Sequence, residues 1–127
     1  MTDHRHSLLL VEDDAEIREP ATALLEDTGY NVLNVSHGRQ ALAALRGGFR
    51  PCAILLDLAM PEMDGLEFRR HQLADSELAA IPVVVVSSGG YDREMGARQL
   101  GLTTFLRKPM DLNACIAAVH RACARLT

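Results

Sequence analysis

The feature that most constrains the fold is a short apolar run that ends at a single carboxylate. Residues 53–56 are apolar, Asp57 follows directly, and Pro51 and Pro61 bound the segment. Four apolar residues between prolines are too few for a helix and are typical of a strand buried on both faces. Ligands of open α/β sheets bind at the carboxyl ends of the strands, where this strand places Asp57. Taken alone, the segment leaves open an aspartate that merely caps the next turn.

The rest of the chain alternates strand and helix patterns. Besides the segment that ends at Asp57, strands are predicted at 7–11, 30–35, 83–86 and 103–107. Helices are predicted at 15–28, after Ser36, after Gly65, at 91–100 and after Asp111. Five strands that alternate with five helices over short connections predict an α/β fold, a parallel sheet covered on both faces.

The helix predicted after Gly65 has a thin apolar stripe. Its apolar members are Leu66, Phe68 and Leu73. Charged residues stand among them, namely Glu67, Arg69 and Arg70. We therefore expect this helix to have a wide solvated face.

Composition indicates one soluble globular domain over residues 1–127. The 127 residues are 48% hydrophobic and 24% charged, which suits a single hydrophobic core. The net charge of −4 argues against a general nucleic-acid or membrane surface. No run approaches the length of a membrane span, and the N-terminus lacks a signal-peptide pattern. Residues 1–6 are expected to be a flexible leader, in which His4 and His6 make a weak case for a metal.

The chain has three cysteines, Cys52, Cys115 and Cys123, an odd number without metal-ligand spacing. Cys115 and Cys123 fall in one predicted helix and are too far apart along it to bridge. The sequence therefore predicts three reduced packing residues in a cytoplasmic protein.

Polar residues follow four of the predicted strands. Glu12 and Asp13 end the first, Asp57 the third, Ser87 the fourth and Lys108 the fifth. Parallel strands share a direction, so these side chains converge at one edge of the sheet. Adjacent acids repel one another unless a cation or a basic side chain lies among them. A helix N-cap explains the neighbouring Asp14 but not the acids before it, so the pattern predicts a site.

With these residues, the chain resembles the receiver domain of bacterial two-component response regulators. The resemblance rests on four segments at the family's spacing: LLLVEDD at 8–14, LLDLAMPEMDG at 55–65, IPVVVVSS at 81–88 and FLRKP at 105–109. It covers nearly the whole chain and implies a flavodoxin-like, doubly wound sheet of strand order 2-1-3-4-5. The chain ends with its fifth predicted helix, so we expect a single receiver domain without an output domain.

The resemblance implies that Asp57 is the phosphoacceptor. The Lys108 ammonium would pair with one phosphoryl oxygen, and the Ser87 hydroxyl would donate a hydrogen bond to another. A carboxylate is a chemically reasonable nucleophile for forming an acyl phosphate. The family also has a cis peptide bond at the position of Lys108–Pro109.

The implied cofactor is Mg²⁺. Glu12 and Asp13 would be the acidic pair that holds it, with Asp13, Asp57 and the Ala59 backbone carbonyl as direct ligands. Mg²⁺ prefers oxygen ligands and bridges carboxylates to phosphates, which supports this assignment. The ion would also reduce the repulsion between the attacking carboxylate and the phosphoryl group.

The implied function is a phosphorylation-activated response regulator, a switch that assists its own phosphorylation and dephosphorylation and is not otherwise an enzyme. A sensor histidine kinase or histidine phosphotransfer protein would donate to Asp57. Ser87 would then move toward the phosphate and Phe105 would turn inward. The face formed by the fourth helix, fifth strand and fifth helix would contact a downstream protein, with no direct role for nucleic acid or membrane.

Several positions depart from the family. Phe105 lacks the hydroxyl of a tyrosine, Met110 replaces the usual aromatic, and Ala59 and Gly89 are small where phosphate-flanking side chains are often larger. Pro20 lies within the first predicted helix, a common docking surface of phosphodonors, where it removes a backbone hydrogen bond and is expected to bend the helix.

Two alternatives remain open besides a receiver excised from a larger regulator or hybrid kinase. A degenerate receiver could act as a phosphorylation-independent interaction module, although the residue types of the site are intact. An aspartate-nucleophile phosphatase or a flavin or nucleotide binder could share the sheet. That class needs a second catalytic aspartate where Ala59 stands, or a phosphate loop after the first strand.

Overall fold

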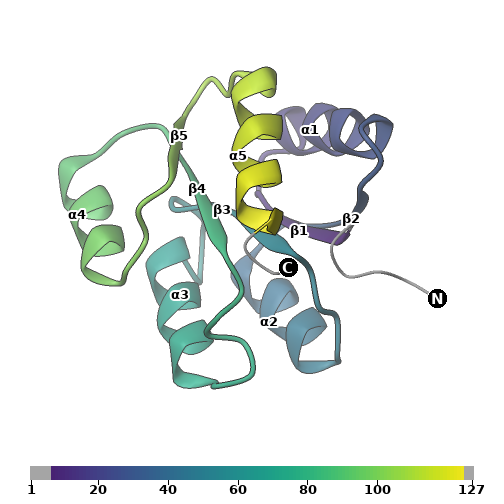
Figure 1. Cartoon of the computed structure of the whole chain (residues 1–127). Helices are drawn as coiled ribbons and strands as arrows, with labels where there is room; N and C mark the ends of the chain where they lie inside the picture. Colours follow the sequence, from purple (N-terminus) through teal and green to yellow (C-terminus); the bar gives the residue numbers. More distant parts are fainter. Residues whose placement is uncertain (1–6, 125–127) are drawn as a thin grey trace.

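The computed structural model describes residues 7–124, so the predicted leader at 1–6 lies outside the described residues. The strands are β1 (Ser7–Val11), β2 (Asn31–Val35), β3 (Ala53–Asp57), β4 (Val83–Ser87) and β5 (Phe105–Arg107). The helices are α1 (Ala15–Asp27), α2 (Gly38–Arg46), α3 (Gly65–Ala74), α4 (Tyr91–Gln99) and α5 (Leu112–Ala124). All strand pairs are parallel, and the order β2-β1-β3-β4-β5 confirms the predicted fold (Figure 1).

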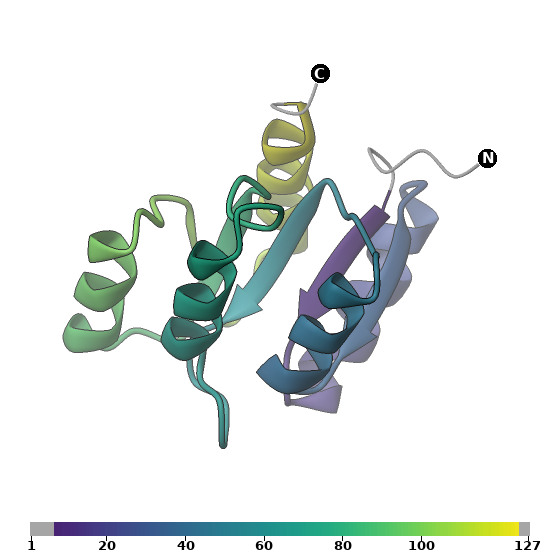
Figure 2. The same cartoon turned by 90° about the horizontal axis from the view of Figure 1, so that it is seen from below.

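The helices cover both faces of the sheet. Figures 1 and 2 show α1 and α5 on one face and α2, α3 and α4 on the other. Leu8 and Leu10 of β1 pack in the core under α1 and α5, whereas Leu9 and Val11 pack in the core under α2 and α3. This alternation follows from the pleat of a strand, which points successive side chains to opposite faces. Within residues 7–124, no helix has the length and apolar character needed to cross a membrane.

The central strand β3 is buried over its full length, as the apolar run before Asp57 predicts. It pairs with β1 on one side and β4 on the other, so helices and strands exclude water from every residue. The β3–β4 register aligns Asp57 with Val86, one residue before Ser87. The strand order and the common strand direction thus bring the polar ends of β1, β3 and β4 together.

Helix α1 begins where the sequence predicts and continues through Pro20. The Asp14 Oδ1 atom accepts a hydrogen bond from the Glu16 backbone N–H at 2.9 Å, which confirms the predicted N-cap. Pro20 lies inside the helix, and Ala21 and Leu25 beyond it are buried in the core. The packing of these apolar residues compensates for the backbone hydrogen bond that a proline cannot donate.

The expectation of a wide solvated face on α3 is wrong for two of its polar residues. Arg69 and Gln72 are buried, whereas Leu73 of the expected apolar stripe is 40% exposed. Gln72 Nε2 donates to the Leu78 and Ile81 carbonyls at 2.9 and 3.1 Å. The loop after α3 folds back over the helix and accepts these hydrogen bonds from Gln72, whereas Arg69 donates to Gln72 and to the Leu100 carbonyl after α4. Helical periodicity does not reveal such contacts.

The prediction of three reduced cysteines is also wrong. Cys52 and Cys123 form a disulfide that closes a sequence separation of 71 residues, and Cys115 is the free, buried cysteine. Cys52 directly precedes β3, and α5 packs on that face of the sheet, so the two Cα atoms lie 4.8 Å apart. Cysteine spacing along the chain carries no information on this contact, because it joins segments 71 residues apart.

The cysteine pairing predicts the result of a thiol titration. In the absence of reductant, the native chain should show almost no fast-reacting thiol, because burial raises the pKa of Cys115 to about 11. The same sample in denaturant should show one thiol per chain, and three after reduction. A colorimetric disulfide-exchange reagent measures all three states, and three thiols in denaturant without reductant would contradict the disulfide.

Candidate functional site

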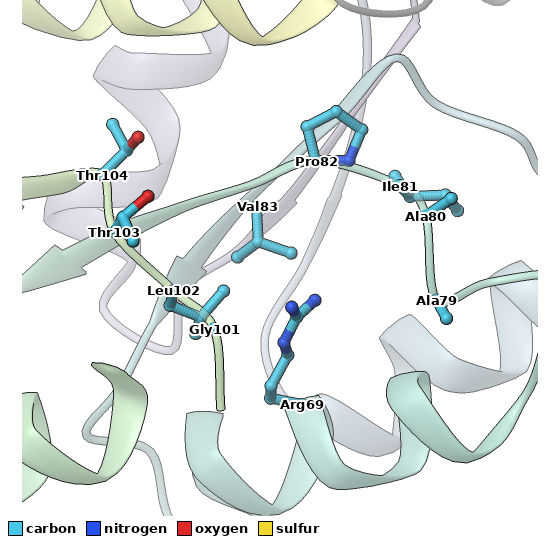
Figure 3. Close-up of a pocket in the computed structure, with 10 residues that line it drawn as sticks. All are labelled: Arg69, Ala79, Ala80, Ile81, Pro82, Val83, Gly101, Leu102, Thr103 and Thr104. Atoms are coloured by element: carbon cyan, nitrogen blue, oxygen red, sulfur yellow. The ribbon is translucent and has the colours of Figure 1, made fainter. Parts of the chain in front are cut away.

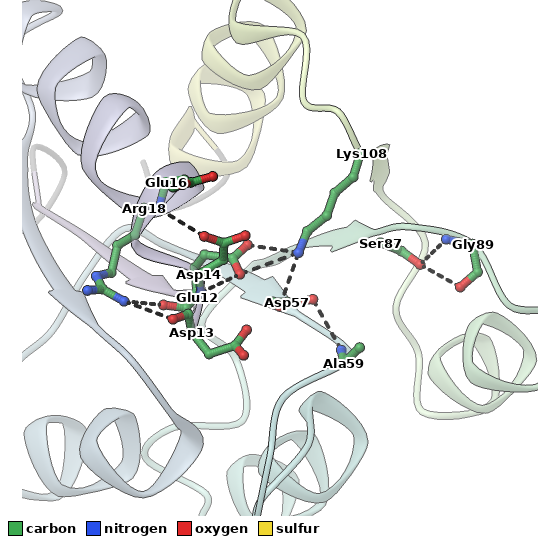
Figure 4. A network of polar contacts seen from close by, with 10 residues as sticks. All are labelled: Glu12, Asp13, Asp14, Glu16, Arg18, Asp57, Ala59, Ser87, Gly89 and Lys108. Carbon is green, nitrogen blue, oxygen red and sulfur yellow. Dashed lines mark hydrogen bonds and ion pairs between the residues drawn. The ribbon is translucent and has the colours of Figure 1, made fainter.

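Three carboxylates from two neighbouring strands form an acidic cluster at the carboxyl edge of the sheet. Glu12 and Asp13 follow β1, and Asp57 is the last residue of β3 (Figure 4). Each offers a carboxylate oxygen, and these oxygens all lie within 4.8 Å of one another. Glu12 and Asp57 are 2% and 1% exposed, whereas Asp13 is exposed. Two acids of the cluster, Glu12 and Asp57, are therefore shielded from solvent, and the third, Asp13, is in contact with it.

Lys108 provides the positive charge that faces this cluster. Its Nζ atom lies 3.0 Å from Glu12 Oε1 and 3.2 Å from Asp57 Oδ2 (Figure 4). It follows β5, and its peptide bond to Pro109 is cis, as the resemblance implies. Burial lowers the pKa of Lys108, but contacts with Glu12 and Asp57 outweigh this effect and leave the pKa above its usual value. The ammonium group therefore stays charged.

Lys108 does not neutralise the acids fully. Burial, then hydrogen bonding and repulsion from Asp57, raise the pKa of Glu12 to about 7. Two groups oppose this rise, since the Asp14 backbone N–H and Lys108 both donate to the Glu12 carboxylate. A carboxyl with such a raised pKa marks a place where more positive charge would be stabilising.

The two oxygens of the Asp57 carboxylate differ, because one accepts a hydrogen bond and the other is in an ion pair with Lys108. Its Oδ1 atom accepts a hydrogen bond from the Ala59 backbone N–H at 3.1 Å. The Oδ2 atom is buried and accepts no hydrogen bond within residues 7–124, although the Lys108 ammonium lies near it. A buried carboxylate oxygen without a hydrogen bond, beside two other acids, fits a divalent cation with oxygen ligands.

The turn after β3 needs a glycine at the start of α3. A Cβ atom at Gly65 would lie 2.7 Å from the Asp57 carbonyl oxygen and 2.8 Å from the Leu58 Cα. The Gly65 N–H also donates to the Leu58 carbonyl at 2.9 Å. The Asp64 side chain caps α3 through the Glu67 N–H. These contacts hold the first turn of α3 directly against the backbone that carries Asp57.

The structure places Ser87 at the end of β4 but directs its hydroxyl away from the acidic cluster. Ser87 Oγ lies 3.2 Å from the Gly89 carbonyl and 3.2 Å from Glu94 Oε2, so its proton has two alternative acceptors. The Gly89 N–H donates back to Oγ at 3.1 Å (Figure 4). Within the described chain no hydrogen bond joins Ser87 to Asp57.

Phe105 begins β5 and is half-buried. It packs against a small cluster of buried residues that includes Val85 of β4 and Ala97 of α4. The Arg98 guanidinium carbon lies 4.5 Å from the ring centroid, which is a cation–π distance. The ring therefore lies between α4 and the sheet, with a cation over one face.

Two polar residues of this region were missed by sequence reasoning. Arg18 Nη1 donates to the Glu12 carbonyl at 2.9 Å and to the Asp13 carbonyl at 3.4 Å, which holds the backbone of the acidic pair (Figure 4). Glu94 accepts from Ser87 and lies 3.7 Å from Arg107. Helical spacing from the end of β1 could have suggested Arg18. Glu94 offers no such signal, because its partners come from distant segments.

A hollow of about 410 Å³ lies beside the acidic cluster. It is lined by Asp13, by Ser36 and His37 from the loop after β2, and by Pro61 and Glu62 from the loop after β3. Glu62 has a φ of 65°, a left-handed conformation that is uncommon for a residue with a side chain. Through this hollow the exposed side of the acidic cluster, at Asp13, is open to solvent.

Comparisons with known proteins agree with this geometry. The response regulator receiver domain model matches residues 8–120. Protein PilH of Pseudomonas aeruginosa is 31% identical over 119 residues, 92% of this chain and 97% of that protein. Response regulator Rre1 of Synechocystis is 34% identical over 94% of this chain, which spans about half of Rre1, 52% of its length.

Solved structures show the same fold. The chemotaxis protein CheY4 of Vibrio cholerae has a TM-score of 0.83 at 27% identity, covering 91% of this chain and 97% of that one. The receiver domain of a signal transduction histidine kinase from Syntrophus aciditrophicus has a TM-score of 0.87 at 29% identity, covering 96% and 92%.

The chain therefore belongs to the response regulator receiver family, whose members act as phosphorylation-activated signalling switches in two-component systems. Receiver domains partner with histidine kinases or phosphotransfer proteins, and the family is not one of classical enzymes. Family membership confirms the resemblance and leaves the phosphatase and the flavin or nucleotide binder without support.

The close contact at Gly65 predicts the effect of a single methyl group. Gly65→Ala should lower the free energy of unfolding by about 1–3 kcal/mol, because the new Cβ overlaps the Asp57 and Leu58 backbone. Gly47→Ala is the matched control, since Gly47 has a φ of −78° and the atom nearest to its new Cβ would be the Ala43 carbonyl oxygen, at 3.2 Å. Urea unfolding measures both, and equal stability of the two variants would contradict the contact.

Proposed function

We propose that Asp57 is the phosphoacceptor of this receiver. The observation that carries the proposal is the buried Oδ2 atom, which accepts no hydrogen bond within the described chain and lies 3.2 Å from the Lys108 ammonium. The other oxygen is held by the Ala59 N–H, so the carboxylate has a fixed orientation. A positioned carboxylate with one oxygen that accepts no hydrogen bond and faces a positive charge is suited to nucleophilic attack.

In the proposed reaction, an Asp57 oxygen attacks the phosphorus of a donor phosphohistidine. The new O–P bond forms as the P–N bond breaks, and the electron pair of that bond passes to the imidazole nitrogen. Lys108 balances the negative charge that gathers on the transferred group, because its ammonium already faces Asp57. The Ala59 N–H keeps the acceptor aligned. By this arrangement the chain would assist its own phosphorylation and dephosphorylation.

Glu12, Asp13 and Asp57, with the Ala59 carbonyl, are the residues proposed to hold Mg²⁺. The cluster offers oxygen ligands from three carboxylates and has a raised pKa at Glu12, both of which favour a divalent cation. When bound, the ion would reduce repulsion between the carboxylates and the phosphoryl oxygens. Arg18 supports the site by holding the backbone of Glu12 and Asp13.

The proposed switch starts at Ser87. Phosphorylation places up to about two negative charges at the edge of the sheet, which attracts hydroxyl donors. When the Ser87 hydroxyl turns toward the phosphate, it loses its hydrogen bond to Glu94 Oε2, which joins β4 to α4. The segment between Ser87 and Glu94 would then move, and the Phe105 ring, which packs beside Val85, would turn inward into the space that this movement leaves. The proposed output surface is therefore the face of α4, β5 and α5, which would bind a downstream protein.

The phosphoacceptor proposal predicts a single Mg²⁺-dependent mass increase. Incubation with a small acyl phosphate should add one phosphoryl group to the chain when Mg²⁺ is present, and none when a chelator removes it. Asp57→Asn should abolish the adduct, because an amide cannot replace the carboxylate nucleophile. Intact-protein mass spectrometry is the measurement.

Asp14→Asn is the matched control for this experiment. Asp14 neighbours the cluster and caps α1, and asparagine caps a helix about as well as aspartate. This variant should accept phosphate like the native chain. Absence of an adduct in the native chain, with a histidine kinase or phosphotransfer protein as well as with the small donor, would leave the phosphorylation-independent interaction module as the function.

The Ser87–Glu94 contact predicts a second result. Glu94→Ala should increase hydrogen exchange of α4 amides in the unphosphorylated protein, because α4 loses its polar link to β4. The difference in exchange between phosphorylated and unphosphorylated protein should shrink at α4. Hydrogen–deuterium exchange with mass spectrometry measures both effects.

Asp92→Ala provides the comparison for Glu94. Asp92 is an acid in the same first turn of α4 and is exposed to solvent. Both changes remove one negative charge near the helix N-terminus, so the helix-dipole effect is shared. Equal exchange in the two variants would show that the Glu94 contact does not restrain α4.

A further inference from the structure

A second hollow lies at the opposite edge of the sheet from Asp57. It has a volume of about 230 Å³ and lies between α3, the segment that leads into β4 and the segment that leads into β5. Figure 3 shows Gly101 to Thr104 on one side, Ala79 to Pro82 on the other, and Arg69 of α3 between them. No residue of the acidic cluster lines it.

Arg69 brings a buried positive charge to this hollow. The residue is 9% exposed, and its guanidinium points from α3 into the space (Figure 3). Nε donates to the Leu100 carbonyl at 3.1 Å, and Nη1 donates to Gln72 Oε1 at 2.8 Å. Nη2 donates no hydrogen bond to any residue in 7–124, so one end of the guanidinium fork faces the hollow without a partner.

The charge of Arg69 has no protein counter-ion in the part of the chain that the structure describes. Both acceptors of its hydrogen bonds are neutral, and no carboxylate there lies within 4.0 Å of it. Burial accordingly lowers its pKa, with no neighbouring acid to oppose the effect. Buried charges in proteins are normally paired, so an uncompensated arginine beside a hollow indicates that a bound group supplies the negative charge.

We propose that this hollow is a binding site for a small free oxyanion, a phosphate or a carboxylate. The planar guanidinium fork matches the paired oxygens of both groups. A volume of about 230 Å³ is several times the roughly 30 Å³ that one water occupies, which leaves room for a small anion. Thr103 and Thr104 also line the hollow, and their hydroxyls are donors of suitable chemistry for an oxyanion.

The experiment uses the full chain without Mg²⁺, so that the acidic cluster does not contribute. The Arg69 Nε–Hε signal is followed by ¹H–¹⁵N NMR during titration with inorganic phosphate and, separately, with acetate, at constant ionic strength. We expect a saturable shift of this signal and of the Gly101 amide, because both groups border the hollow. The two titrations distinguish a phosphate site from a carboxylate site.

Two variants make the result specific. Ala80→Glu places a carboxylate at the exposed wall of the hollow and leaves the hydrogen bonds of Arg69 intact, so anion affinity should fall by about tenfold or more. Arg70→Gln removes the adjacent exposed arginine of α3 and should leave the affinity unchanged. A linear, non-saturating shift, or equal affinity in Ala80→Glu and the native chain, would overturn the proposal.

Discussion

Mutual repulsion among buried carboxylates is the constraint on which this structure depends. Glu12 and Asp57 are almost fully buried within reach of each other, and a single ammonium, that of Lys108, faces both. The balance is incomplete, because the pKa of Glu12 stays raised to about 7. Burying such a cluster lowers the stability of the fold at this edge, and the same excess of negative charge favours cations there.

The surrounding backbone is arranged to keep these charges in place. Parallel β1 and β3 bring the acids side by side, and β5 delivers the lysine from the far side of β4. Arg18 fixes the chain beyond β1, while the absence of a Cβ at Gly65 lets α3 begin directly against the Asp57 carbonyl. These restraints come from different segments, so the site needs β1, β3, β4 and β5 to be in place together.

The sequence predicts this edge well because strand direction alone brings the ends of β1, β3, β4 and β5 together. Sequence-based prediction fails where it must decide which neighbours a side chain contacts in the folded chain. The Ser87 hydroxyl points to Glu94, and Arg69 is buried although its neighbours in sequence suggest a solvated helix face. The Cys52–Cys123 disulfide joins segments whose contact is set by how α5 lies on the sheet. Local periodicity carries no information on such tertiary contacts.

Helix α4 connects the two edges of the sheet. Ala97 is its one buried residue, so little apolar area holds it in position. Near its beginning Glu94 accepts from Ser87, and at its end the Leu100 carbonyl accepts from Arg69. A helix with one buried residue and a polar contact near each end responds to charge placed at either end more than a helix anchored by a wide apolar face. Phosphate at the Asp57 edge and an anion at the Arg69 edge would thus act on the same element.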